Sequence, residues 1–382
     1  MKPDQWHFSR PELAAGYLSL FGLGLSSART LFARRRMGKT EFLLKDLIPA
    51  ATKGGCLTAY VNLWDDDEEP AGALVGALYG AIEPNWWGRL ARRAKSPVKK
   101  LKATGNIPAF GEASVEAELS AEDKKYVGTL LSDALKSFDS QPKPLLLIID
   151  EAQVLAAAAH SNFAHALRAG LDVRKDRLKV IFAGSSESTL RTMFGRSSEP
   201  FFNWAPLEPF PLLGRDFLVF MVEKVNTIAK HQLSMKHAVA AFDQLNSTPE
   251  FFRRFLERHL TYPFDGPDAA LQFTKEHVFN HEQFKRQWTG LLPADRALLG
   301  MMAEGMVSDF HGQPAREQLG ILLGLPKAPP MNTPAHSLRR LQADNIVTKL
   351  AHGEYRFEDE AFAQWIREQR VMGDDAPGAV FP

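Results

Sequence analysis

Two short motifs carry residue types that could bind and cleave a nucleoside triphosphate. The first, ARRRMGKT at residues 33–40, matches the end of the phosphate-binding pattern G-x-x-x-x-G-K-[ST] through Gly38, Lys39 and Thr40. In such a loop, backbone N–H groups surround the phosphates, the lysine reaches the β- and γ-phosphates and the hydroxyl binds Mg²⁺. A three-residue match is weak alone, because a basic surface turn between a strand and a helix could have the same three residues without binding phosphate.

The second motif is an apolar run, PLLLIID, that ends in Asp150 and is followed by Glu151. Two carboxylates at the mouth of a buried strand are costly without a cationic partner, and Mg²⁺ with ATP would supply one. Asp150 is predicted to hold the metal through water, and Glu151 to orient and deprotonate the attacking water. The two motifs together predict an ATP site with Mg²⁺ as its metal.

Two further residues are candidates for catalysis. Ser185 follows the apolar run VIFAG and could contact both nucleotide and water, although a serine there could also cap the next helix. Arg196 lies after that helix and could reach the γ-phosphate held by a neighbouring subunit. The alternative for Arg196 is an exposed arginine in a loop.

The composition is that of an ordinary globular chain. It has 382 residues, a net charge of +1 and an apolar content of 45%, so any nucleic-acid role requires a local patch. The single cysteine, Cys56, excludes an intrachain disulfide and a thiolate zinc cluster, and favours a cytoplasmic location. No apolar run approaches the ~18 residues of a spanning helix, so no membrane association is expected.

The order of apolar runs predicts an α/β fold. Short runs at 29–33, 57–63, 144–150 and 179–184 are typical of strands buried on both faces of a parallel sheet, and helical patterns separate them. The predicted organisation continues with helical patterns alone and ends in three helices and a hairpin around His352 and Gly353, which is a winged helix. The expected parts are an α/β domain at 1–212 with a basic or hairpin insertion at 84–118, a helical lid at 213–288, a winged helix at 289–370 and a flexible tail at 371–382.

Two basic segments are candidate nucleic-acid contacts. Residues 88–102 carry seven Lys or Arg and no acidic residue, directly after two tryptophans. The third helix of the winged helix offers His336, Arg339, Arg340 and Gln342. The alternatives are a solvated insertion or a patch for an acidic partner in the first case, and a protein-docking module in the second.

The order of these motifs resembles that of the archaeal-type ATPases, which are AAA+ and STAND P-loop ATPases. Their loops commonly read G-x-R-R-x-G-K-T, where Arg35 and Arg36 match the paired arginines best and Arg34 and Arg35 match with a shift of one residue. Their second motif commonly reads D-E-x-Q, which Asp150, Glu151 and Gln153 match. Two departures are Ala33 at the first loop position and NSTP at 246–249, where the family commonly has GG-x-P. The residues expected around the nucleotide are Ala33, Arg35, Arg36, Met37, Gly38, Lys39, Thr40 and Glu41.

The first departure leads to a conformational prediction. Alanine is tolerated in place of glycine where the backbone φ is negative and is strained where it is positive. We therefore expect a negative φ at Ala33. The arginines Arg34 to Arg36 could contact phosphates or the lid, or could be solvated.

The resemblance implies an ATP-hydrolysing molecular switch, slow or stimulated by a partner. Its nucleotide would lie between the α/β domain and the lid, and would control oligomerisation and an activity associated with DNA. The alternative is a STAND-type regulator that controls a protein effector, such as a nuclease of a defence or mobile-element system, without contacting DNA. A third possibility, an ATPase homologue that binds without cleaving, is disfavoured by the presence of Glu151.

Overall fold

The computed structural model describes residues 4–65, 69–82, 127–278, 281–349 and 354–373. These residues form two compact units. The first comprises residues up to 33 and 38–211, and the second comprises 34–37 and 212–382. The expected insertion at 84–118, the basic segment 88–102 within it and most of the expected tail lie outside the described residues.

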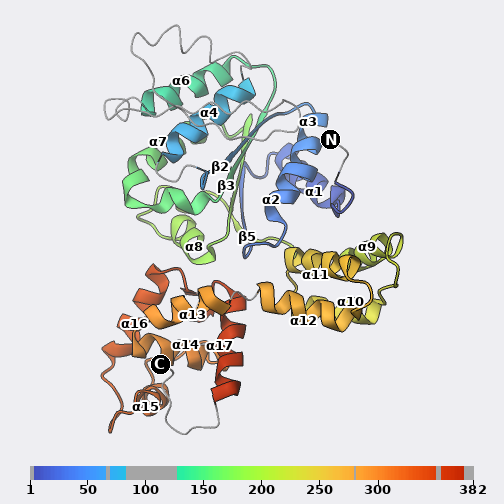
Figure 1. The fold of residues 1–382 in the computed structure, drawn as a ribbon. Coiled ribbons are helices and arrows are strands. Elements are labelled where there is room, and N and C mark those ends of the chain that lie inside the picture. Colours follow the sequence, from blue (N-terminus) through green and yellow to red (C-terminus); the bar gives the residue numbers. More distant parts are fainter. Residues whose placement is uncertain (1–3, 66–68, 83–126, 279–280, 350–353, 374–382) are drawn as a thin grey trace, which may run out of the picture. The chain divides into compact units, whose positions relative to one another are not determined.

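A five-stranded parallel sheet in the order β2-β3-β4-β1-β5 forms the centre of the first unit (Figure 1). Its strands are β1 (Ala28–Phe32), β2 (Leu57–Asn62), β3 (Leu145–Asp150), β4 (Leu178–Gly184) and β5 (Leu207–Pro209). The first four confirm the predicted strands, and every residue of β3 is buried, as a continuous apolar run requires. β5 is not among the predicted strands, because its three residues, Leu-Glu-Pro, show no apolar periodicity.

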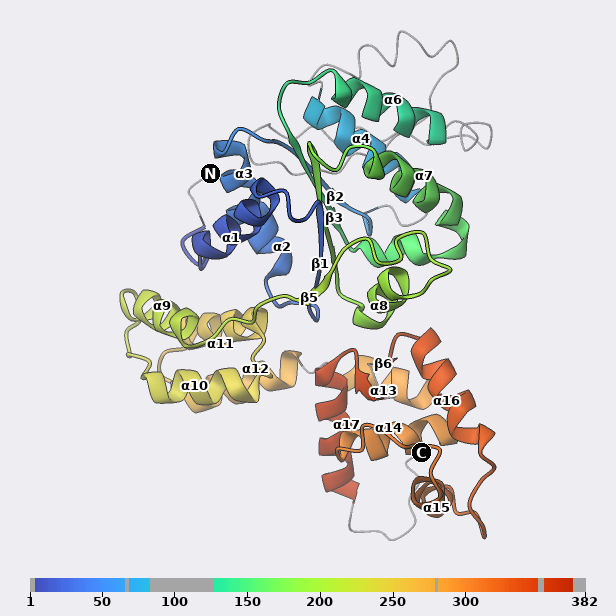
Figure 2. The same ribbon diagram turned by 180° about the vertical axis from the view of Figure 1, so that it is seen from behind.

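Helices cover both faces of this sheet, as Figures 1 and 2 show. On one face lie α1 (Pro11–Gly22), α2 (Lys39–Phe42) and α3 (Ile48–Lys53), the last two joined without a break by a π-helical segment (Leu43–Leu47). On the other lie α4 (Pro70–Ile82), α6 (Val127–Asp139) and α7 (Ser161–Asp172), and α8 (Glu187–Gly195) follows β4. The confirmed fold class is a three-layered α/β domain with its main core between the sheet and the helices α4, α6 and α7.

The N-terminal segment is fixed to the helix that carries Lys39. Asp46, in the π-helical segment, has a side chain that is 1% exposed. One of its oxygens accepts hydrogen bonds from the Ser9 hydroxyl (2.6 Å) and the Arg10 N–H (3.2 Å), and lies 3.1 Å from His7 Nε2. Because these contacts join the chain before α1 to the continuation of α2, they help to orient the helix at the phosphate-binding loop.

From residue 212 on, the second unit starts with four helices in the range where the sequence predicts a lid. They are α9 (Arg215–Asn226), α10 (Met235–Gln244), α11 (Pro249–Thr261) and α12 (Gly266–Val278). The turn before α11 contains Asn246 at φ 55° and Ser247 at φ 49°. These two residues stand at the glycine positions of the GG-x-P pattern given above, so the sequence NSTP forms a left-handed turn without glycine.

The remaining elements have the order of a winged helix preceded by one helix. They are α13 (His281–Gly290), α14 (Pro293–Ala303), α15 (Gln313–Leu322), α16 (Asn332–Ala343), β6 (Val347–Lys349), β7 (Tyr355–Phe357) and α17 (Glu360–Gly373). β6 and β7 are antiparallel, and the predicted turn at His352 and Gly353 lies outside the described residues.

The helix α13 packs against α17 through aromatic side chains. The ring centroids of Phe284 and Phe362 are 5.3 Å apart, and those of Trp288 and Trp365 are 6.1 Å apart. The sequence analysis assigns α13 to the lid, and we propose instead that the lid ends at Val278. No helix among the described residues is long and apolar enough to cross a membrane.

Candidate active site

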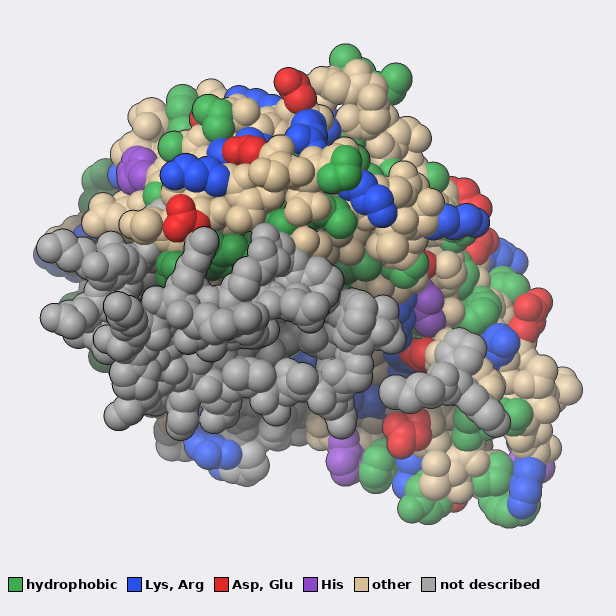
Figure 3. Space-filling view, turned by 90° about the horizontal axis from the view of Figure 1, so that it is seen from above, with side chains coloured by type: hydrophobic (Ala, Val, Ile, Leu, Met, Phe, Trp, Pro, Cys, Tyr) green, Lys and Arg blue, Asp and Glu red, His purple; other side chains and the backbone are tan. Residues whose placement is uncertain are grey.

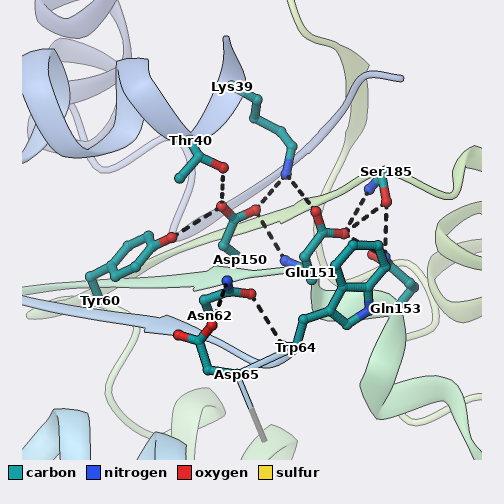
Figure 4. A network of polar contacts seen from close by, with 10 residues as sticks. All are labelled: Lys39, Thr40, Tyr60, Asn62, Trp64, Asp65, Asp150, Glu151, Gln153 and Ser185. Carbon is teal, nitrogen blue, oxygen red and sulfur yellow. Dashed lines mark hydrogen bonds and ion pairs between the residues drawn. The ribbon is translucent and has the colours of Figure 1, made fainter. Parts of the chain in front are cut away.

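The sheet topology brings three sequence motifs to one edge. β4 lies between β1 and β3, and all three strands are parallel, so their carboxyl ends meet. β1 leads into the loop that contains Lys39, β3 ends at Asp150, and β4 ends at Gly184 directly before Ser185. Residues separated by more than 100 positions in the chain therefore share one site (Figure 4).

The phosphate-binding loop has the conformation that its sequence permits. The Ala33 N–H donates to the Gly184 carbonyl at 3.3 Å, which continues the pairing of β1 with β4. The positive φ values within residues 33–40 occur at Arg36 (68°) and Gly38 (79°), so φ at Ala33 is negative, as predicted. Glycine is favoured at residue 38, before α2, because its left-handed conformation (φ 79°) would strain a residue that carries a Cβ.

Asp150 is the centre of the site's hydrogen bonds. Its side chain is 1% exposed, and Oδ1 accepts from Lys39 Nζ and from the Glu151 N–H (3.0 Å). Oδ2 accepts from the Thr40 hydroxyl (2.6 Å) and the Tyr60 hydroxyl (3.2 Å). Burial raises the pKa of Asp150, but the Lys39 charge and these hydrogen bonds outweigh it and hold the pKa below its ordinary value. The carboxylate is therefore ionised at neutral pH.

Glu151 is fixed at the other side of the same cluster. Its backbone is left-handed (φ 53°, ψ 41°), an uncommon conformation for this residue type that turns the side chain out of the strand direction. Its Oε2 accepts from Ser185 through both the N–H (3.2 Å) and the hydroxyl (2.8 Å), and from Gln153 Nε2 (2.6 Å). Its Oε1 lies 3.9 Å from Lys39 Nζ, so both carboxylates face the same ammonium group.

The two serines after β4 have different partners. Ser185 contacts Glu151, whereas Ser186 is the N-cap of α8 and accepts from the Thr189 N–H at 3.4 Å. The helix-cap interpretation therefore applies to Ser186. The predicted role of Ser185 toward nucleotide and water stays a prediction.

The other sequence candidates do not join the Asp150 cluster. Within the second unit, Arg34 donates to the Asn246 carbonyl (3.2 Å) and Arg36 lies 3.5 Å from Glu250 and over the Phe251 ring. Glu41 pairs with Lys45 one turn along the helix (2.7 Å). Met37 is buried at 2% exposure, and Arg35 is exposed.

Arg196 lies at the C-terminal end of α8 and is exposed. Among the described residues no ion pair or side-chain hydrogen bond involves it. Its predicted role toward a neighbouring subunit stays a prediction.

Two site residues carried no functional signal of their own in the sequence. Tyr60 was not singled out, because a tyrosine inside a strand is usual for strands. Gln153 matched a family pattern without a role, and the structure places its amide on Glu151 and on the Ser185 hydroxyl (3.2 Å). Only the pairing of β2 with β3 could have indicated that Tyr60 and Asp150 are neighbours.

Gly184 permits the Gln153 contact, and this leads to a first prediction. A Cβ at Gly184 would lie 2.2 Å from Gln153 Oε1 and 2.9 Å from Leu190 Cδ1, both of which are the far ends of flexible side chains. We expect Gly184→Ala to keep the fold but to displace the Gln153 amide from Glu151, with a loss of turnover of roughly tenfold or more, as for a lost hydrogen bond to a charged group. In a Gln153→Ala background the same change should cost little more, and equal losses in both backgrounds would contradict the coupling.

Comparison with known proteins supports the fold. No protein-family model matches the sequence, and no curated protein matches it. Among solved structures, the chain is similar to a Walker-type ATPase of Pyrococcus abyssi, with a TM-score of 0.59 and 16% identity over 94% of this chain and 95% of that one. The chain has the fold of a Walker-type P-loop ATPase.

Two further solved structures show weaker similarity. They are the Orc1 protein of Aeropyrum pernix in complex with DNA (TM-score 0.47, 13% identity, 98% and 97% of the two chains) and Cdc6p of Pyrobaculum aerophilum (TM-score 0.42, 14% identity, 94% of each chain). At such identities similarity shows a fold, so the chemistry of this chain rests on its own residues.

Proposed function

We propose that this chain binds ATP with Mg²⁺ at the carboxyl edge of its sheet and hydrolyses it. The observation that carries the proposal is the convergence of Lys39, Thr40, Asp150 and Glu151 at one point of that edge. An ammonium group, a hydroxyl and two carboxylates are the set that phosphoryl transfer to water requires.

The residues present fit Mg²⁺ as well as nucleotide. Hydroxyl and carboxylate oxygens are ligands that Mg²⁺ prefers, and Asp150 is ionised while almost fully buried. Thr40 and Asp150 would hold the ion, Asp150 through water. Held there, the ion would supply positive charge that offsets the negative charge developing on the phosphates.

Each side chain of the site then has a separate role in hydrolysis. Lys39 neutralises the β- and γ-phosphates, and the N–H groups at the start of α2 bind phosphate oxygens. Glu151 orients the attacking water and accepts its proton at a carboxylate oxygen. Ser185 and Gln153 fix the rotation of that carboxylate by donating to Oε2, which leaves Oε1 for water.

We further propose that the nucleotide state switches the second unit, as in AAA+ or STAND ATPases. Support comes from the loop itself, because Ala33 and Gly38 belong to the first unit whereas the intervening residues 34–37 belong to the second. A ligand bound at Gly38 and Lys39 would lie next to residues 34–37 along the chain. The ligand shifts such a switch only by its difference in affinity for the two states.

We propose that this switch controls oligomerisation and an activity on DNA. In the oligomer, Arg196 would contact the ATP of a neighbouring subunit. The alternative is control of a protein effector without DNA contact. The described part of the surface in Figure 3 shows Lys or Arg and Asp or Glu side chains interspersed. The DNA proposal depends on the basic composition of the segment 88–102, which lies outside the described residues.

One experiment separates these proposals. Phosphate release and oligomeric state are measured for the wild type and Glu151→Gln, each with and without duplex DNA. We expect phosphate release by the wild type and ATP-dependent oligomers in the variant. No phosphate release under any condition contradicts hydrolysis, a monomer that ATP leaves unchanged contradicts the role of Arg196, and indifference to DNA favours the effector alternative.

A second prediction concerns the winged helix, where two neighbouring arginines have different partners. Arg340 donates to both oxygens of Asp295 (3.1 and 2.6 Å), which is 2% exposed, whereas Arg339 is exposed. We expect Arg340→Ala to destabilise this unit by about 1–2 kcal/mol, since a buried carboxylate loses a half-exposed partner.

Arg339→Ala should leave stability unchanged. If the winged helix binds DNA, Arg339→Ala should weaken binding to duplex DNA. The slope of the logarithm of affinity against the logarithm of salt concentration should then fall in size by about 1. Denaturation and DNA titrations at several salt concentrations check both. Weaker DNA binding only for Arg340→Ala would contradict the assignment.

A further inference from the structure

Asp150 accepts four hydrogen bonds, and two of their donors have a second role in the proposed function. Lys39 is recruited by the phosphates and Thr40 by the metal. The remaining donors are the Glu151 N–H on Oδ1 and the Tyr60 hydroxyl on Oδ2. Each carboxylate oxygen thus has one donor that ligand binding does not recruit.

We infer that Tyr60 is a positioning residue that holds Asp150 in its metal-binding orientation while nucleotide engages Lys39 and Thr40. The inference rests on the proposed binding of ATP with Mg²⁺. It assigns to β2 a part in the site that the two motifs on β1 and β3 do not include. Tyr60 itself touches neither nucleotide nor metal in this account.

The sheet supplies the geometry. β2 pairs with β3 in parallel register, with Tyr60 beside Ile148 and Asn62 beside Asp150. The tyrosine is therefore placed one pleat before the end of β2, and the length of its side chain brings the hydroxyl to Oδ2 at 3.2 Å. Figure 4 shows this hydroxyl approaching Asp150 from the side opposite Lys39.

The hydroxyl is suited to be a permanent donor. The neutral phenol hydroxyl of Tyr60 lies 3.2 Å from Asp150 Oδ2 and donates to it. Unlike a lysine, it adds no charge that would repel a metal. Partners of this kind behind a metal-binding carboxylate typically change metal affinity by about 10–100-fold when they are removed.

Tyr60→Phe tests the inference, because it keeps the ring and removes only the donor. Binding of a fluorescent ATP analogue is measured in EDTA and at increasing Mg²⁺, for the wild type, Tyr60→Phe and Tyr262→Phe. The last is a matched control, because Tyr262 is exposed in the second unit and packs only its ring, against Arg258.

We expect Tyr60→Phe to bind the analogue as the wild type does in EDTA. Its half-saturating Mg²⁺ concentration should rise about 10–100-fold, while Tyr262→Phe leaves it unchanged. A Mg²⁺ dependence equal to that of the wild type would overturn the inference. So would an affinity lost equally with and without Mg²⁺, which indicates a structural role. If the wild type itself fails to bind, the proposed function falls and the inference with it.

Discussion

Glu151→Gln is expected to lower ATP turnover by about 10²–10⁴-fold while nucleotide binding stays within a few-fold of the wild type. The substitution keeps the size of the side chain and removes its ability to take a proton from water. Ser185 and Gln153 donate to Oε2 of Glu151, and a glutamine oxygen can still accept there. The site should therefore remain assembled around an inert side chain.

Steady-state phosphate release and binding of a fluorescent ATP analogue measure the two effects separately. Glu257→Gln is the matched control, because Glu257 is exposed on α11. It should change neither quantity. Turnover of Glu151→Gln close to that of the wild type would contradict the role of Glu151 as general base.

Lys39→Met is expected to abolish nucleotide binding and, in protein without nucleotide, to lower the free energy of unfolding by about 3–5 kcal/mol at neutral pH. Lys39 is 6% exposed and Asp150 is 1% exposed, so the variant leaves a buried carboxylate without its cation. Combining it with Asp150→Asn should restore most of the stability, because the uncompensated charge is then gone. Nucleotide binding should not return.

The pH dependence gives this prediction a direction. In the wild type the folded-state pKa of Asp150 lies below its ordinary value of 3.8. The ionised Asp150 therefore contributes its full stabilisation above pH 3.8, and this stabilisation is lost as the pH falls through the lowered folded-state pKa. Without Lys39, burial raises the folded-state pKa, and the ionised carboxylate destabilises the fold at neutral pH. The difference between wild type and variant should therefore shrink as the pH falls toward 3.8 and below.

Urea denaturation over a range of pH measures this difference. Lys45→Met is the matched control, because Lys45 makes only partly exposed ion pairs with Asp4 and Glu41. It should cost no more than about 1 kcal/mol. A difference between wild type and Lys39→Met that does not change with pH would show that the Lys39–Asp150 pair is not its source.

The sequence predicted the parts of this site that depend on local patterns. The strands β1 to β4 follow from short apolar runs, because a strand buried on both faces must be apolar throughout. Gly38, Lys39 and Thr40 follow from a loop pattern, and Asp150 and Glu151 from two carboxylates after a buried strand. Each of these signals lies within about ten consecutive residues.

The sequence did not predict what depends on pairing between distant segments. Tyr60 reaches Asp150 only because β2 and β3 are neighbours, and Asp46 holds His7 and Ser9 only because the N-terminal segment returns to the helix after Lys39. Similarly, the sequence of α13 predicts one more amphipathic helix, and its aromatic residues alone do not indicate that the helix packs against α17.

Binding of a fluorescent ATP analogue to the wild type, with Mg²⁺ and then with EDTA, tests the central claim most directly. The account predicts saturable binding that unlabelled ATP displaces, that weakens in EDTA and that Lys39→Met lacks. Binding that is not saturable, or that is equally strong in Lys39→Met, would contradict an ATP site formed by Lys39, Thr40 and Asp150.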